Sequence, residues 1–86
     1  MRLLKFYASW CGPCKQQGNI LEGFKALPIE SIDVDDDDNT DIIDKYGIRG
    51  LPTILLLDDK DEIIKRFSGL TSLEEINEAI KNYEQN

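Results

Sequence analysis

The hydrophobic positions at the start of the chain predict a strand followed by a helix. Residues 2–8 are densely apolar and β-favouring, which predicts a largely buried strand. Residues 13–27 carry apolar side chains at helical spacing, and we expect Pro28 to end this helix. Gly18 and Asn19 should weaken the middle of the helix. The apolar stripe consists of Ile20, Leu21, Phe24 and Leu27.

The middle of the chain predicts a strand, a short helix and another strand. Residues 29–35 alternate imperfectly between apolar and polar side chains, which predicts the first of these strands. Asn39 or Thr40 can cap a short helix that stops at Gly47. Residues 54–57 are apolar without alternation, as in a strand that is covered on both faces. The inward-facing residues of the short helix are Ile42, Ile43 and Tyr46.

The end of the chain predicts a hairpin and a final helix. Residues 58–61 form a turn that leads into a hairpin partner at residues 63–67. Ser72 and Glu75 have the spacing of a capping box at the start of the last helix. The order βαβαββα predicts a parallel first pair of strands and an antiparallel last pair, hence an α/β fold. The apolar face of the last helix consists of Leu73, Ile76, Ala79, Ile80 and Tyr83.

The composition is that of one small domain spanning residues 1–86. A hydrophobic fraction of 41% in 86 residues is enough for one modest core. Seventeen acidic and ten basic residues give a net charge of −7, which argues against nucleic acid or an anionic membrane as a partner. No apolar run approaches the ~20 residues of a membrane span, and the start of the chain lacks a signal-peptide pattern. We therefore expect a cytoplasmic protein.

Two cysteines, Cys11 and Cys14, carry the candidate chemistry, because the chain has no other cysteine and no histidine. They lie between the first predicted strand and the first helix, where unpaired backbone N–H groups favour a thiolate. The pKa of such a thiol falls from about 8.5 to roughly 3.5–7.5. Pro13 suits the first helical turn because its missing N–H would have no helical partner. In a reducing cytosol, this pair is better explained as a redox pair than as a structural disulfide.

Metal binding is the weaker interpretation of the cysteines and of the acidic run. A zinc site needs four ligands, and two cysteines without histidine supply half of them, which leaves only a metal shared between two chains. Residues 33–44 have acids at several positions of a calcium loop, but Asp38 stands where that loop needs glycine. We therefore predict no metal site and a solvated acidic loop, which favours basic partner surfaces.

Two segments of the chain resemble the thioredoxin family. The first is Phe-Tyr-Ala-Ser-Trp-Cys-Gly-Pro-Cys-Lys at residues 6–15. The second is Lys-Tyr-Gly-Ile-Arg-Gly-Leu-Pro-Thr at residues 45–53, and Gly69 follows it. A lone Cys-x-x-Cys is a weak signal, whereas both segments together are specific. The resemblance covers nearly the whole chain and implies a thioredoxin fold with a four-stranded mixed sheet and three helices.

The resemblance also implies a role for each site residue. Cys11 would be the attacking thiolate and Cys14 the buried resolving thiol. Pro52 would be a cis proline facing the cysteines, and the Leu51 backbone would pair with the bound substrate chain. The remaining substrate-binding residues would be Trp10, Gly12, Pro13, Gly50 and Gly69.

The implied activity is reduction of protein disulfides through a mixed disulfide, with no bound cofactor beyond the redox-active cysteine pair. The implied partners are disulfide-containing proteins, with ribonucleotide reductase as a common client of the family. An NADPH-dependent thioredoxin reductase would recycle the protein, which we expect to be a monomer. The Gly-Pro pair between the cysteines matches the reducing members of the superfamily.

The chain departs from the family at four places. The opening strand and helix are missing, and Lys5 stands where thioredoxins carry a buried acid. Ser31 replaces the lysine near that acid, and Asn19 replaces the proline that kinks the active-site helix. Lys5 either packs its stem on the sheet or lies behind Cys14 and tunes proton transfer. In the second case, Lys5→Ala should slow disulfide exchange.

Two alternatives to a thioredoxin-like reductase stay open. A glutaredoxin-like enzyme working with glutathione fits the small size, but residues 69–71 lack the double glycine and acid that glutaredoxins use. A thioredoxin scaffold that serves as a binding subunit would not need its cysteines. Comparing the two electron donors tests the first alternative, and a variant with both cysteines changed to serine tests the second.

Overall fold

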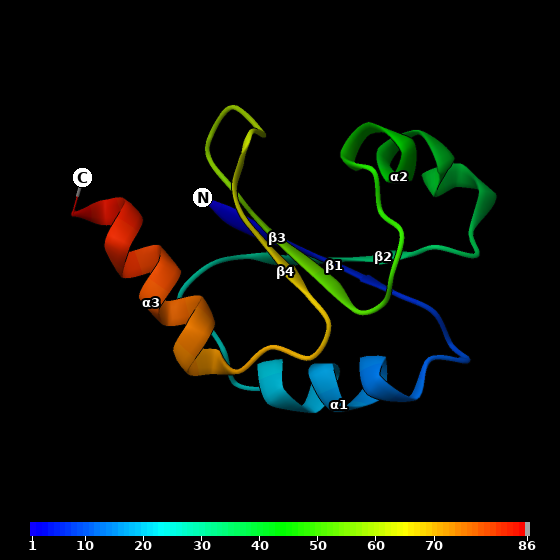
Figure 1. Cartoon of the computed structure of the whole chain (residues 1–86), viewed down its shortest axis with the longest axis horizontal. Helices are drawn as coiled ribbons and strands as arrows, with labels where there is room; N and C mark the ends of the chain where they lie inside the picture. Colours follow the sequence, from blue (N-terminus) through cyan, green and yellow to red (C-terminus); the bar gives the residue numbers. More distant parts are fainter. Residues whose placement is uncertain (86) are drawn as a thin grey trace.

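The structure is a computed structural model that describes residues 1–85, and it has one four-stranded sheet with three α-helices (Figure 1). The elements are β1 (Arg2–Tyr7), α1 (Gly12–Leu21), β2 (Ile29–Asp33), the 3₁₀ turn η1 (Asp37–Asn39), α2 (Thr40–Tyr46), β3 (Thr53–Leu57), β4 (Ile63–Ser68) and α3 (Leu73–Glu84). The strand order is β2-β1-β3-β4. β1 pairs with β2 in parallel and with β3 antiparallel, and β3 pairs with β4 antiparallel. The predicted fold class and the βαβαββα order are therefore confirmed.

The helices cover both faces of the sheet, with α1 and α3 on one face and α2 on the other (Figure 1). All five residues of β3 are buried, which confirms the interpretation of the unbroken apolar run. Ile54 and Leu56 point into the core under α1 and α3, whereas Leu55 and Leu57 point into the core under α2. β3 thus contributes side chains to the hydrophobic core on both faces of the sheet, because successive side chains of a strand lie on opposite faces.

The first helix is shorter than its apolar stripe predicted. α1 ends at Leu21 rather than near residue 27, because Glu22 is extended and Gly23 adopts a left-handed φ of 85°. Only glycine takes that conformation without steric cost. Phe24 and Leu27 still pack against the core, but they do so from an irregular segment.

The short helix is capped differently from the prediction, although it stops at Gly47 as expected. Asn39 occupies the N-cap position of α2 but makes no capping bond with its side chain, and Thr40 is already helical. The Asn39 amide instead donates to the Asp33 carbonyl at 2.9 Å. The η1 turn precedes α2, and the Asp36 side chain caps that turn by accepting from the Asp38 N–H. The acidic loop therefore caps the 3₁₀ turn that leads into α2, and Asn39 holds the predicted N-cap position of α2 without a capping bond from its side chain.

The final helix begins at the predicted capping box. The Ser72 hydroxyl accepts from the Glu75 N–H at 3.2 Å, and the Glu75 carboxylate accepts from the Ser72 N–H at 3.4 Å. Ile76 and Ile80 are buried as expected. Tyr83 was predicted to fill the same face but is 42% exposed, because it lies in the last turn of α3 beyond the buried core.

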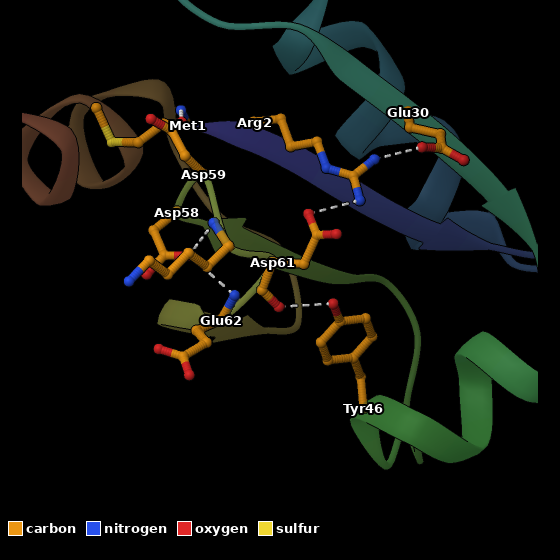
Figure 2. A network of polar contacts seen from close by, with 9 residues as sticks. Met1, Arg2, Glu30, Tyr46, Asp58, Asp59, Asp61 and Glu62 are labelled. Atoms are coloured by element: carbon orange, nitrogen blue, oxygen red, sulfur yellow. Dashed lines mark hydrogen bonds and ion pairs between the residues drawn. The ribbon is translucent and has the colours of Figure 1, made fainter.

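Polar contacts tie the first two residues to the β3–β4 turn (Figure 2). Arg2 forms ion pairs with Glu30 on β2 at 2.8 Å and with Asp61 in the turn at 3.0 Å. The Tyr46 hydroxyl donates to the Asp61 carbonyl at 2.8 Å, which connects α2 to the same turn. The N-terminal amino group hydrogen-bonds Asp59 and holds the pKa of that carboxyl below its usual 3.8, with a smaller contribution from its charge. These contacts join β1, β2, α2 and the β3–β4 turn at the end of the sheet that lies away from the cysteines.

Among residues 1–85, no helix has the length and apolar character needed to cross a membrane.

Candidate active site

The two cysteines lie where β1 passes into α1. Cys11 is the N-cap of α1, with an extended backbone, and its sulfur accepts a hydrogen bond from the Cys14 N–H at 3.2 Å. The Cys11 N–H in turn donates to the Ala8 carbonyl at 3.1 Å, which closes the turn after β1. The helix starts at Gly12, one residue before the expected start, and Pro13 lies in its first turn. A backbone N–H aimed at the Cys11 sulfur favours the thiolate form of that residue when the pair is reduced.

Cys11 and Cys14 are joined by a disulfide, so the structure represents the oxidised protein. Each cysteine is only 5% exposed. They form a small apolar cluster with Ala8, against which Leu51 and Val34 pack. An incoming thiolate opens this bond to a mixed disulfide, and a second thiol completes the two-electron reduction to two cysteine thiols.

The loop before β3 lies against the cysteine turn. The Leu51–Pro52 peptide bond is cis. Pro52 is buried, and its carbonyl accepts from the Gly69 N–H at 2.9 Å. Gly69 has a φ of 81°, a conformation that glycine adopts without steric cost. Residues from three distant parts of the chain thus meet at one place.

A shallow cleft of about 600 Å³ opens beside the disulfide. It brings together Cys11 and five of the residues expected at the substrate surface, namely Trp10, Gly12, Pro13, Gly50 and Leu51. Gly69 lines an adjoining depression of about 380 Å³ that shares Arg49, Gly50 and Leu51 with the first. Cys14 lines neither of these surfaces.

Trp10 is 71% exposed at the rim of the cleft and is held by a residue that sequence reasoning missed. Its indole N–H donates to the Asp35 carboxylate at 2.8 Å. The Asp35 N–H donates to the Asp33 carboxylate at 3.0 Å, which fixes the loop that carries it. Asp35 is one of several consecutive acids, so no feature of the sequence distinguished it from its neighbours.

Lys5 lies on the other side of the disulfide, where it shares a pocket of about 460 Å³ with Cys14, Tyr7 and Gly18. The residue is half-buried, and its Nζ lies 5.6 Å from the centroid of the Tyr7 ring. A Cβ built on Gly18 would lie 3.7 Å from that Nζ, an ordinary van der Waals contact, so the ammonium group lies beside Gly18 of α1. Lys5 is therefore positioned behind Cys14 rather than beside Cys11.

Gln17 is a second residue that sequence reasoning missed. Its side chain is fully buried and forms two hydrogen bonds with the backbone of Thr71. The signal for burial was present, because residues 14, 17 and 21 share one helical face and both Cys14 and Leu21 are apolar. The nature of its partner could not be predicted, since Thr71 is far away in the sequence.

The acidic run forms local turns. The carboxylates of Asp33 and Asp36 accept backbone N–H bonds two residues further on. Within residues 1–85, no group of three or more acidic or cysteine side chains is arranged to hold a metal ion.

A disulfide between two cysteines at a helix start, beside an open apolar cleft, defines a thiol–disulfide oxidoreductase. The family model for thioredoxin matches residues 1–82. The thioredoxins of Listeria monocytogenes and Bacillus subtilis are 34% and 35% identical to the chain. Both matches cover 94% of this chain, and they cover 81% and 80% of those proteins. The chain belongs to the thioredoxin family.

Solved structures show the same fold. Thioredoxin 1 of Thermosipho africanus is 28% identical with a TM-score of 0.77, and the match covers 99% of this chain and 96% of that one. A thioredoxin variant from Halobacterium salinarum is 32% identical with a TM-score of 0.80, covering 94% and 72%. The predicted thiol–disulfide oxidoreductase and protein-disulfide reductase activity are thereby confirmed. Members of this family act on disulfide-containing proteins and receive electrons from thioredoxin reductase.

Proposed function

We propose that residues 1–86 form a single-domain, monomeric, cytoplasmic reductant of protein disulfides in which Cys11 attacks and Cys14 resolves. The Cys11 thiolate attacks one sulfur of the substrate disulfide, and the other substrate sulfur leaves as a thiolate that takes up a proton. The Cys14 thiolate then attacks the Cys11 sulfur and releases the second substrate thiol. Two electrons and two protons have moved to the substrate, and the Cys11–Cys14 disulfide remains.

One observation carries this assignment of roles: Cys11 lines the open cleft, whereas Cys14 lines the pocket on the opposite side. A substrate sulfur that enters this cleft would meet Cys11, because Cys14 is not among the residues that line it. The N–H of Cys14 also points at the Cys11 sulfur, which favours the thiolate at the attacking position.

The substrate chain would lie across the surface between Trp10 and Gly69. The Leu51 backbone offers hydrogen-bonding groups next to Pro52, at the edge of the cleft. Gly12, Pro13 and Gly50 have little or no side chain that could block an approaching backbone.

Lys5 would act on the second step, because its charge shares the Cys14 pocket. A positive charge near Cys14 favours the resolving thiolate. We expect Lys5→Met to slow insulin reduction at neutral pH, whereas Lys65→Met, an equal charge change at an exposed position of β4, should not. Equal rates for the wild type and both variants would assign Lys5 a packing role.

The decisive experiment traps the intermediate. Cys14→Ser should accumulate a mixed disulfide with a protein substrate, and Cys11→Ser should not. Trapping by Cys11→Ser alone would reverse the assigned roles, and trapping by neither would refute exchange through this pair. Non-reducing electrophoresis and mass spectrometry of the Cys11 peptide give the readout.

The electron donor and clients are tested separately. We expect an NADPH-dependent thioredoxin reductase to reduce the oxidised protein faster than glutathione does; the opposite order would favour a glutaredoxin-like role. Ribonucleotide reductase is the first client to assay. Retained cellular activity in a Cys11→Ser, Cys14→Ser variant would indicate a binding subunit instead. Size-exclusion chromatography with light scattering tests the monomer.

A further inference from the structure

Gln17 connects the active-site helix to the loop between β4 and α3. Its side-chain nitrogen donates to the Thr71 carbonyl at 2.9 Å, and its side-chain oxygen accepts from the Thr71 N–H at 2.8 Å. Gln17 is 0% exposed and Thr71 is 3% exposed, so water does not compete for these groups. Both backbone groups of Thr71 depend on this one side chain, as they would on a neighbouring strand.

The hydrogen bonds continue from Thr71 to the cis proline. The Thr71 hydroxyl donates to the Gly69 carbonyl at 2.9 Å, and the Gly69 N–H donates to the Pro52 carbonyl at 2.9 Å. Gln17 lies one helical turn after Cys14. A continuous set of hydrogen bonds therefore joins the helix that carries the cysteines to the loop that carries Pro52.

We propose that Gln17 is a positioning residue that keeps the Pro52 loop and Gly69 in register with the disulfide. The proposal rests on the proposed function, because it assigns the substrate chain to the surface between these groups. The pairing of β1 with β3 ends at Phe6 and Thr53, so it places Pro52 relative to the end of β1 but does not orient the helix α1 that follows the cysteine turn. A shift of about 1 Å between reacting groups can cost a hundredfold in rate, which makes this register important.

Packing alone does not account for an amide at this position. Methionine has nearly the same length and would fill the same volume, and it would not leave polar atoms of its own to satisfy. Methionine would, however, leave the buried N–H and C=O of Thr71 without their partners, so the amide both satisfies these groups and selects one arrangement of the loop around it. The two bonds to Thr71 favour a role in orientation over a role in filling space.

The test compares Gln17→Met with Gln16→Met, an exposed neighbour on the same helix. Each variant is assayed with insulin and with the neutral disulfide of 2-mercaptoethanol, at a temperature where circular dichroism shows it fully folded. For Gln17→Met we expect KM for insulin to rise about fivefold to tenfold, with the rate on the small disulfide changed less than twofold. Gln16→Met should match the wild type on both substrates.

A second variant guards against misfolding of Gln17→Met. Thr71→Val keeps the shape of the side chain and removes only the bond from its hydroxyl to Gly69, so it should raise KM for insulin in the same direction by a smaller factor. Equal losses on both disulfides, or unchanged KM in both variants, would overturn the positioning role. A wild type that reduces neither disulfide would instead refute the proposed function.

Discussion

Reducing the Cys11–Cys14 disulfide should lower the stability of the fold by a small and calculable amount. The two cysteines are separated by only three positions, so the bond closes a very short loop. For about four residues, the chain-entropy expression gives close to 2 kcal/mol of stabilisation at 25 °C. The reduced form recovers about 0.3–1 kcal/mol, because the start of α1 stabilises the Cys11 thiolate. The net loss on reduction is therefore about 1–2 kcal/mol.

Thermal unfolding measures this difference directly. One kcal/mol corresponds to about 4–8 °C for a domain of this size, so the oxidised protein should melt roughly 5–15 °C above the reduced one. The control is Cys14→Ser, which cannot form the bond and whose Tm should not respond to reductant. A reduced wild type that melts at or above the oxidised one would refute the reasoning, because stabilisation of the Cys11 thiolate would then exceed the stabilisation from closing the disulfide loop.

Three further perturbations test the core, the cleft and the far end of the sheet. Ile76→Ala should lower the free energy of unfolding by about 2–5 kcal/mol in denaturant titration, because Ile76 is fully buried. Ile63→Ala, at a 40% exposed position, should lower it much less, and equal losses in the two variants would contradict the burial pattern. Asp35→Asn should raise KM for insulin about twofold to fivefold by weakening its bond to Trp10, and an unchanged KM would show that the rim needs no such support. The pKa of Asp59 is lowered in the fold, so its stabilisation is present above pH 3.8 and lost as pH falls through the folded value. Asp59→Asn should therefore make the decrease in Tm on acidification less steep than in the wild type. If the two proteins show the same dependence of Tm on pH, Asp59 does not contribute to stability in this way.

Local sequence signals predicted the fold where one segment determines the outcome. The unbroken apolar run of β3, the capping box at Ser72 and the stop at Gly47 each depend on residues within a few positions of one another. The end of α1 was missed because Phe24 keeps helical spacing while Gly23 breaks the backbone. The spacing of apolar side chains indicates which residues can share one helical face, but it does not predict the backbone angles that a glycine adopts.

In the candidate site, too, the features set by neighbouring residues were predicted and those set by distant residues were missed. Cys11 and Cys14 were recognisable from a five-residue motif, and the resemblance to a family placed Pro52 beside them. Asp35 and Gln17 were missed because their partners lie far away in the sequence. Long-range hydrogen bonds to indole and backbone groups leave no periodic trace along the chain.

The polar network around Arg2 lies at the end of the sheet remote from the disulfide, and the C-terminal turns of α3 extend toward the same side of the molecule (Figure 1). A tag, a fused protein or a tether to a surface that follows α3 would therefore leave the cleft beside Cys11 facing solution. Immobilised on a bead through its last helix, a Cys14→Ser variant would present Trp10 and Cys11 outward. The position of α3 thus makes this chain suited to capturing its own substrates as mixed disulfides.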